Sequence, residues 1–377
     1  MIKLFNVNIS PDVDRALIET LHSGYITQGP KVDKFEKVLD EYFYPSSAVT
    51  VNSGTSALQL ALRLAGVGPG DEVITTAMTC SATNLPILAL GAKPIWADIN
   101  KLTGNIDPES VENLINEKTK AVMCVAWGGL PCDTEILQKI TEKHGIKLIE
   151  DAAHAMGLRD SFADYVCFSL QAIKHITTGD GGIVLVNTDD AAVARAKRLR
   201  WFGIDRKAGS KDTRIEEDIE EWGYKFHMND LTATMGLVQI KTLNKILARH
   251  REIAKKYRQA LSNYFVGPAQ SNLAGAENHY WLYTVLLPSS GQRNSFKDWM
   301  LKHNVQVSQV HRRNDEYTVF NTSKNQYLPD IGITRGLESL DYFAERMICL
   351  PIHNGMSNED VSQVISVANK FALEHQR

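Results

Sequence analysis

The chain has 377 residues, a formal net charge of −3, and a composition that is 44% hydrophobic and 23% charged. This length predicts about two domains. The slightly negative charge gives no reason to expect a nucleic-acid or membrane surface, since such binding needs a concentrated basic face. The five cysteines form no CxxC pair, so we expect neither a disulfide framework nor a metal site. The sequence has no signal-peptide pattern and no apolar run near the ~20 residues of a membrane span, which predicts a cytoplasmic protein.

Seven short apolar segments follow one another between residues 47 and 187, and several have the continuous hydrophobicity of strands covered on both faces. They are residues 47–54, 71–77, 93–99, 120–127, 146–151, 165–170 and 181–187. Residues 55–66 and 135–145 carry apolar side chains at helical spacing and end in glycine. Strands that alternate with helices predict an α/β domain with a mostly parallel sheet.

The pattern changes after Asn229, where one long helical segment extends to about Tyr264. Beyond it, the sequence predicts strands at 281–288 and 305–311 and a terminal helix at 357–375, with Ser357 as its N-cap. We therefore expect a large domain at residues 1–245 and a smaller C-terminal α+β domain at residues 246–377.

Asp151 ends the apolar strand in IKLIEDAAHAMG (146–157), at the edge where open α/β sheets place their ligand sites. A carboxylate there could be a metal ligand, a base, a partner for a cationic ring nitrogen, or only a helix N-cap.

Lys174 lies in CFSLQAIKHITTGDGG (167–182), on a loop between two apolar strands. Most lysines are solvated surface residues, but a lysine desolvated in such a loop has a lowered pKa and becomes nucleophilic.

The segment VNSGTSALQLAL (51–62) leads from a strand into a helix through small polar residues. Free N–H groups at a helix start can hold a phosphate, although a plain capped turn has the same appearance. A phosphate site, a carboxylate at a strand end and a loop lysine are together the parts that pyridoxal phosphate (PLP) requires. The lysine would form the Schiff base, and the carboxylate would keep the pyridine nitrogen protonated.

The succession of NSGTSAL, AMTCSATN, EDAAHAMG and FSLQAIKHITTGDGG resembles the DegT/DnrJ/EryC1/StrS family of PLP-dependent sugar aminotransferases. The resemblance extends from about Gly24 to the terminal helix. It implies a fold-type-I transferase that works as a homodimer with shared active sites.

The resemblance also assigns roles to individual residues. Lys174 matches the Schiff-base lysine, Asp151 the partner of the ring nitrogen, and His154 the neighbour of the ring hydroxyl. Phosphate contacts are implied for Gly54, Thr55, Ser56 and Ser169, and Thr27 and Gly29 match an N-terminal substrate loop.

Three positions depart from the family pattern. Cys80 stands where many members have an aromatic residue that stacks on the cofactor, so that platform is thinner. Lys225 replaces an asparagine that reaches the neighbouring subunit's phosphate, where a lysine could make a charge-assisted contact. His154 replaces glutamine and adds a group expected to titrate near neutral pH.

The resemblance favours amino transfer from glutamate to a nucleotide-linked keto-sugar, foremost an NDP-4-keto-6-deoxyhexose. One family branch has histidine in place of the lysine and dehydrates sugars. His175 follows Lys174 directly, but Ser169 lies five positions before Lys174, as in the aminotransferases. A sugar dehydratase, a keto-inositol aminotransferase and a catalytically silent regulator with this fold remain alternatives.

The segment VHRRNDEYTVF (310–320) supplies candidate contacts for the diphosphate and base of such a substrate. Its candidates are His311, Arg312, Arg313 and Tyr317, because guanidinium groups bind phosphates in a bidentate manner. A solvated edge or a subunit contact is the alternative for this cluster.

Overall fold

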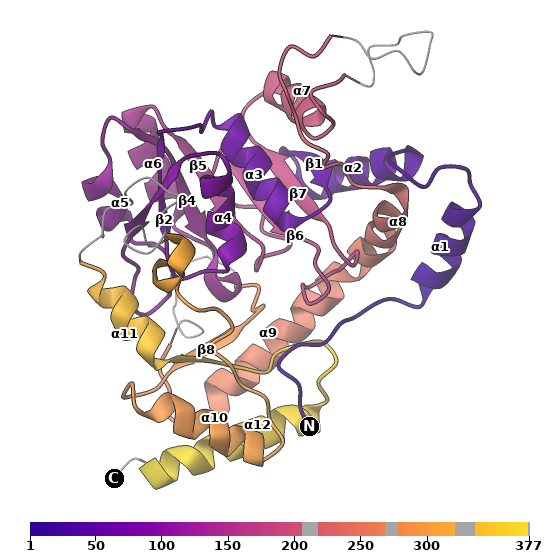
Figure 1. Cartoon of the computed structure of the whole chain (residues 1–377). Coiled ribbons are helices and arrows are strands. Elements are labelled where there is room, and N and C mark those ends of the chain that lie inside the picture. The colour runs from indigo at the N-terminus through magenta and orange to yellow at the C-terminus, as the bar shows by residue number, and fades with distance from the viewer. Residues whose placement is uncertain (206–217, 268–277, 321–335, 376–377) are drawn as a thin grey trace.

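The computed structural model in Figure 1 describes residues 1–205, 218–267, 278–320 and 336–375. A seven-stranded sheet lies between helices, and a second group of elements lies beyond one end of it. No helix among the described residues is long and apolar enough to cross a membrane.

The sheet has the strand order β1-β7-β6-β5-β4-β2-β3. All of its neighbouring pairs are parallel except those of β7, which runs antiparallel to β1 and β6. The seven predicted strands are confirmed, with the bounds Ser47–Val51, Glu72–Thr76, Lys93–Ala97, Thr119–Val125, Lys147–Asp151, Tyr165–Ser169 and Gly182–Val186 for β1 to β7.

Helices cover both faces of this sheet, which explains why its strands are continuously apolar. Side chains of one hydrophobic core come from α2, α5, α6 and α8 (Pro30–Phe43, Pro108–Leu114, Thr134–His144 and Asp230–Gln239). The core on the other face draws on α3, α4 and α7 (Gly54–Leu64, Ser81–Ala89 and Asp190–Leu199). Strand residues alternate between the two cores, as Val122 and Met123 of β4 show. The predicted helices at 55–66 and 135–145 are therefore present as α3 and α6.

The C-terminal elements form another core around a two-stranded antiparallel sheet of β8 (Tyr283–Leu286) and β9 (Met347–Leu350). The helices α10 (Gln292–Lys302) and α12 (Asn358–His375) pack there, and α11 (Glu338–Arg346) contributes to a neighbouring core. Ser357 caps α12 as predicted, because its Oγ accepts the N–H of Asp360 at 3.1 Å.

The long helical segment predicted from Asn229 is divided into α8, a short 3-10 turn and α9 (Leu243–Ala260). The predicted boundary at residue 245 falls inside α9. Leu243 and Leu247 of α9 belong to the core under the large sheet, whereas Ile253 and Tyr257 belong to the C-terminal core. Figure 1 shows α9 running from one group of elements to the other.

The predicted strand at 305–311 is wrong. Val305 and Ser308 make only isolated bridges, to Ile2 and Cys349 respectively. Val310 has a φ of 62°, which a β-branched residue rarely adopts and which interrupts the extended backbone. The bridge between Ile2 and Val305 places the first residues of the chain beside the C-terminal elements. The N-terminal helix α1 (Asp12–Leu21) follows them.

Candidate active site

The carboxyl ends of β1, β5 and β6 lie at one edge of the sheet and bring the predicted phosphate cradle together. Ser53 caps α3, because its Oγ accepts the N–H of Ser56 at 3.0 Å. Ser56 donates its hydroxyl to Asn52 at 2.6 Å, so it supports the turn. Thr55 is exposed in the first turn of α3, where backbone N–H groups lack helical acceptors.

Gly54 is required for the shape of this cradle. A Cβ atom at Gly54 would lie 2.8 Å from Cβ of Ser169, which ends β6. The backbone of the α3 turn therefore lies directly against Ser169, so that amide groups and a hydroxyl face the same space. This arrangement fits a phosphate group, and the phosphate contacts of Gly54, Thr55 and Ser169 stay a prediction.

Asp151 is buried at the end of β5 and holds two hydrogen bonds. Its Oδ2 accepts the hydroxyl of Thr83 at 2.7 Å, and its Oδ1 accepts the N–H of Ala153 at 3.0 Å. Burial raises the pKa of Asp151, while the Thr83 hydrogen bond and the charge of Lys174 act in the opposite direction. A positive group beside this carboxylate would therefore be strongly favoured.

Lys174 lies close enough to Asp151 for the two charges to interact. Burial lowers the pKa of Lys174 to about 8, against the opposing influence of Asp151 and Cys80. The ammonium lies 3.6 Å from the centroid of the Trp281 ring. Trp281 Nε1 also donates to the carbonyl of Ile173 at 2.9 Å, so that tryptophan fixes the loop and the lysine together.

His154 stacks on the same tryptophan, with ring centroids 3.9 Å apart and an interplanar angle of 21°. Its Nδ1 accepts the N–H of Gly128 at 3.3 Å, which leaves the proton of the neutral ring on Nε2. The expectation that His154 titrates near neutral pH is wrong. Burial and the charge of Lys174 hold the pKa of His154 well below its usual range.

His311 joins this group, whereas the arginines that follow it do not. Its ring lies parallel to that of His154 at 5.6 Å, and its buried Nε2 has no hydrogen-bond partner. Burial and the charge of Lys174 lower the pKa of His311 to about 3. Both histidines are therefore neutral beside Lys174.

Arg312 and Arg313 are paired with carboxylates of the same chain. The exposed Arg312 contacts Glu316 at 2.8 Å and lies over the ring of Tyr317. The partly buried Arg313 holds both carboxylate oxygens of Asp315, at 2.7 and 2.8 Å, and also contacts Asp341 of α11. Arg313 thus anchors the segment, and Arg312 is the more accessible cation of the two.

Thr27 and Gly29 lie on a loop that Asp230 fixes at the start of α2. The carboxylate of Asp230 accepts the N–H groups of Gly29, Lys31 and Val32 at 2.8 to 3.1 Å. A Cβ atom at Gly29 would lie 2.8 Å from Asp230, so the contact requires glycine. Gly29 has a structural role here, while Thr27 is exposed beside His227.

Lys225 is exposed on a segment beside the phosphate cradle. Its carbonyl accepts Nδ2 of Asn52 at 3.3 Å, and its ammonium lies over the rings of Trp201 and Phe202, at 4.7 and 5.1 Å from their centroids. A contact with a neighbouring subunit stays a prediction.

Three residues that the sequence did not single out support the site. Trp281 contacts Lys174 and His154, Thr83 contacts Asp151, and Asn314 is buried among the residues around Thr83. Thr83 lies within the noted threonine-rich segment AMTCSATN, which was a signal for it. Trp281 lies in the predicted strand at 281–288, whose apolar pattern indicated a strand but no role in the site.

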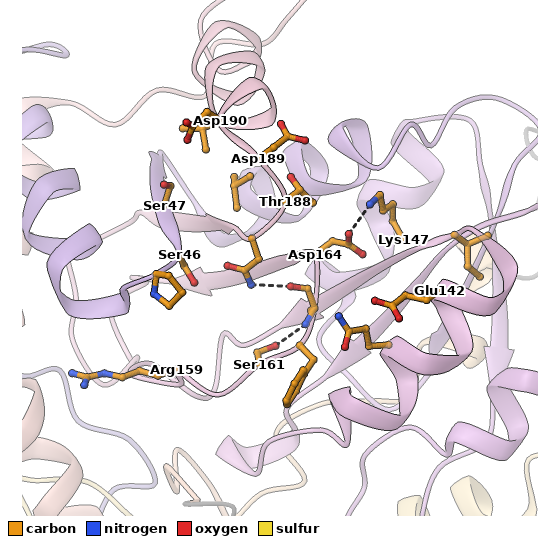
Figure 2. A pocket seen from close by; sticks show the side chains of 18 of the residues that line it. Ser46, Ser47, Glu142, Lys147, Arg159, Ser161, Asp164, Thr188, Asp189 and Asp190 are labelled. Carbon is orange, nitrogen blue, oxygen red and sulfur yellow. Dashed lines mark hydrogen bonds and ion pairs between the residues drawn. The ribbon is translucent and has the colours of Figure 1, made fainter.

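A polar pocket of about 650 Å³ lies at the opposite edge of the sheet. Figure 2 shows its lining, in which Lys147 pairs with Asp164 at 2.6 Å. Glu142, Asp189 and Asp190 add further acidic groups. None of the predicted site residues lines this pocket, so it does not belong to the site around Lys174.

Comparisons with known proteins place this geometry in a family. Residues 8–368 match the model of the DegT/DnrJ/EryC1/StrS aminotransferase family. The spore coat polysaccharide biosynthesis protein SpsC of Bacillus subtilis (strain 168) is 34% identical over 367 residues, which cover 92% of this chain and 91% of SpsC.

Solved structures agree in fold. The sugar aminotransferase CalS13 of Micromonospora echinospora superposes with a TM-score of 0.86 at 30% identity, over 98% of this chain and 100% of CalS13. Spr1654 of Streptococcus pneumoniae in its PLP form gives 0.87 at 27% identity, over 98% of both chains. These similarities confirm the expected fold-type-I architecture.

The cradle beside Ser169, the buried carboxylate and the desolvated lysine fit the phosphate, the ring nitrogen and the aldehyde of PLP. The chain belongs to the DegT/DnrJ/EryC1/StrS aminotransferase family and is a PLP-dependent sugar aminotransferase.

Proposed function

We propose that this enzyme transfers an amino group from glutamate to a nucleotide-linked keto-sugar, foremost an NDP-4-keto-6-deoxyhexose. The observation that carries the proposal is the grouping of Lys174, Asp151 and the open start of α3 at one sheet edge, with His311 beside them. The relatives named for sugar amination and for polysaccharide biosynthesis support a sugar substrate. The product would be an amino-sugar nucleotide for O-antigen or another polysaccharide, made in the cytoplasm.

The chain's own residues would hold the cofactor at both ends. The first-turn amides of α3, Thr55 and Ser169 would bind its phosphate, and Lys174 would hold it covalently. When bound, PLP supplies a ring that withdraws electrons from the substrate carbon. Asp151 would keep the proton on the ring nitrogen, and His154 would donate its Nε2 proton toward the ring hydroxyl.

Lys174 would also move the proton between the substrate carbon and its acceptor. Its pKa near 8 leaves part of the population as the neutral amine at physiological pH, so the amine can accept a proton. Lys174 is only partly exposed, which limits loss of the proton to solvent.

We place the sugar nucleotide against the segment that begins at His311. His311 would face the sugar, because its ring lies beside that of His154 and its buried Nε2 has no hydrogen-bond partner. Arg312 and Tyr317 would contact the diphosphate and the base, and Arg313 would hold the segment on α11. Thr27 would approach the sugar from the N-terminal loop that Gly29 shapes.

A second copy of the chain would complete the site. Large apolar side chains are exposed on two stretches of the chain: Ile18, Leu21, Tyr25 and Ile26 on the first, and Phe202 and Trp222, near Lys225, on the second. Thr27 and His227 connect the two stretches at 3.5 Å. Their burial in a homodimer would favour association, and Lys225 between them would reach the partner's cofactor phosphate.

A panel of keto-sugar nucleotides, assayed by mass spectrometry with glutamate as donor, tests the proposal. We expect a mass change of ketone to amine for a 4-keto-6-deoxyhexose nucleotide, and bleaching of the visible cofactor absorbance when glutamate is added alone. A protein that binds PLP without such bleaching would instead be a silent regulator. Loss of water from the sugar without amination would identify a dehydratase.

A further inference from the structure

A fully buried asparagine from the C-terminal part of the chain lies inside the turn that precedes α4. Asn314 donates its backbone N–H to the carbonyl of Ala77 at 2.8 Å and its Nδ2 to the carbonyl of Thr79 at 2.7 Å. Its Oδ1 accepts Nδ2 of Asn84 at 2.9 Å. One residue thus fixes both ends of residues 77–84, through its backbone at Ala77 and through its side chain at Thr79 and Asn84, although more than 200 positions separate it from them in the sequence.

The turn that Asn314 holds contains Thr79 and Thr83, and Thr83 is hydrogen-bonded to Asp151. Thr83 donates its hydroxyl to Oδ2 of Asp151 at 2.7 Å, so its oxygen is left to accept the hydroxyl proton of Thr79, which lies 2.7 Å away. All three side chains are buried, which strengthens these bonds and makes a broken one costly. The position of Thr79 therefore decides where Thr83 holds the carboxylate.

Asn314 also holds the segment that carries His311. Its Nδ2 is 3.3 Å from the carbonyl of Arg312, and Arg313 on the other side is anchored through Asp315. His311, next to the strained backbone of Val310, is thereby kept parallel to His154. The same asparagine thus contacts the cofactor side and the sugar side of the site.

We propose that Asn314 is a positioning residue of this aminotransferase, which acts on the cofactor through Thr79, Thr83 and Asp151. Its amide fixes the carbonyl of Thr79. The hydroxyl of Thr79 then positions that of Thr83, and the Thr83 hydroxyl holds Asp151 where it would meet the ring nitrogen. The inference rests on the proposed role of Asp151. The new element is that Asn314, far away in the sequence, determines the position of the Asp151 carboxylate.

A double-mutant cycle tests this path. The apparent dissociation constant for PLP is measured by absorbance titration of the apoenzyme for wild type, Asn314→Ala, Thr83→Val and the double variant. Each single variant should raise the constant roughly tenfold, since one buried hydrogen bond to a charged group is weakened. The double variant should bind PLP no more weakly than Thr83→Val alone. An unchanged constant in Asn314→Ala, or additive effects in the double variant, would overturn the proposal.

Asn369 offers a matched control. Its side chain also makes two bonds to backbone, to Ala260 and Ser262 at 2.8 Å, but it lies in α12. Asn369→Ala should lower Tm without changing the PLP constant. If Asn314→Ala does not fold, Asn314→Leu keeps a side chain of similar size without a charge and removes the Nδ2 donor, and the same tenfold rise is expected.

These measurements need no sugar, so they separate the two proposals. Failure of every keto-sugar in the panel would reject the substrate assignment and leave the cycle intact. An additive cycle in an enzyme that aminates keto-sugars would reject only the role of Asn314.

Discussion

The amino group of Lys174 lies 3.6 Å from the centroid of the Trp281 ring, and the indole N–H of Trp281 bonds to the carbonyl of Ile173. The tryptophan therefore restrains both the end of the lysine side chain and the backbone that precedes it. Phe5 stacks against Trp281 with ring centroids 5.0 Å apart, and His154 stacks on it as well. The nucleophile is thus held by residues from three distant parts of the sequence.

The rate at which the apoenzyme captures PLP should depend on pH with a midpoint near 8. The neutral amine is the nucleophile, so lowering its pKa to about 8 means that the rate rises with pH up to that point and then levels off. Stopped-flow absorbance measures this rate. A free lysine derivative, with the ordinary pKa of 10.5, is the reference. A midpoint near 10 in the protein would show that the amine is solvated.

Lys174→Ala should abolish turnover while leaving the fold intact. Borohydride should no longer fix PLP covalently to the protein, because the amine that forms the Schiff base is gone. Borohydride-trapped PLP in that variant would place the attachment on another lysine.

Asp151→Asn should lower the turnover rate by several orders of magnitude while PLP remains bound through its phosphate. The amide cannot hold the proton of the ring nitrogen by charge, so the ring withdraws electrons less strongly. Single-turnover absorbance with glutamate measures the effect. A loss under about tenfold, or ~1.4 kcal/mol, would leave Asp151 with only a structural role.

The strands that carry the site could be predicted, because buried parallel strands are recognisable from their apolar runs alone. Asp151, Ser169 and Lys174 follow such strands, and their positions at one edge follow from the sheet. Trp281 and Asn314 could not be predicted, since their contacts depend on how the C-terminal elements dock, and that of Asn314 with Thr79 spans 235 positions. Thr83 was signalled only by its segment, because its partner Asp151 is 68 positions away. The same limit applies to Arg313, whose partner Asp341 is 28 residues away, and to Val310, whose positive φ ends the predicted strand.

Glu150→Gln should stabilise the protein more at pH 8 than at pH 5. Burial raises the pKa of Glu150 to about 7, from 4.5, despite hydrogen bonds from Ser161 Oγ and the N–H of Cys132. A carboxyl group with a raised pKa contributes stability below pH 4.5 that is lost as the pH rises through 7. Glutamine cannot ionise, so the Glu150→Gln variant should keep this stability at pH 8. Thermal unfolding at both pH values measures the difference.

Glu142→Gln, an acidic residue that lines the polar pocket at the opposite edge of the sheet, is the matched control. Parallel pH curves for wild type and Glu150→Gln would mean that Glu150 is ionised throughout this range. Cys124 and Cys132 lie beside Glu150, and the pKa values of both thiols are raised, so the thiols should stay protonated over this range and Glu150 is the group of this cluster that titrates.

Mixed dimers of Lys174→Ala and Lys225→Ala should regain part of the activity that each variant lacks alone. If Lys225 reaches the partner's cofactor phosphate, a mixed dimer contains one site in which both lysines are intact. Turnover after subunit exchange measures this complementation. Native mass spectrometry confirms that mixed dimers have formed. Their inactivity would assign Lys225 to its own subunit, beside Trp201 and Asn52.

Arg312→Ala should weaken substrate binding, whereas Arg313→Ala should mainly lower stability. Arg312 is exposed and its pair with Glu316 contributes little to stability, so its loss should raise the apparent KM for the keto-sugar nucleotide roughly tenfold with little change in Tm. The glutamate half-reaction should be unchanged. Loss of Arg313 leaves Asp315 and Asp341 without their cation and should lower Tm and impair both half-reactions.

The comparison of a nucleotide sugar with the same sugar lacking its nucleotide completes this test. The difference in apparent KM between the two should shrink in Arg312→Ala, because only the diphosphate meets that guanidinium. Arg159→Ala, which removes an arginine that lies over Tyr42 away from the site, is the control and should leave the difference unchanged. Efficient amination of an unphosphorylated keto-sugar or a keto-inositol by the wild-type enzyme would reject the nucleotide-sugar assignment, whatever the variants show.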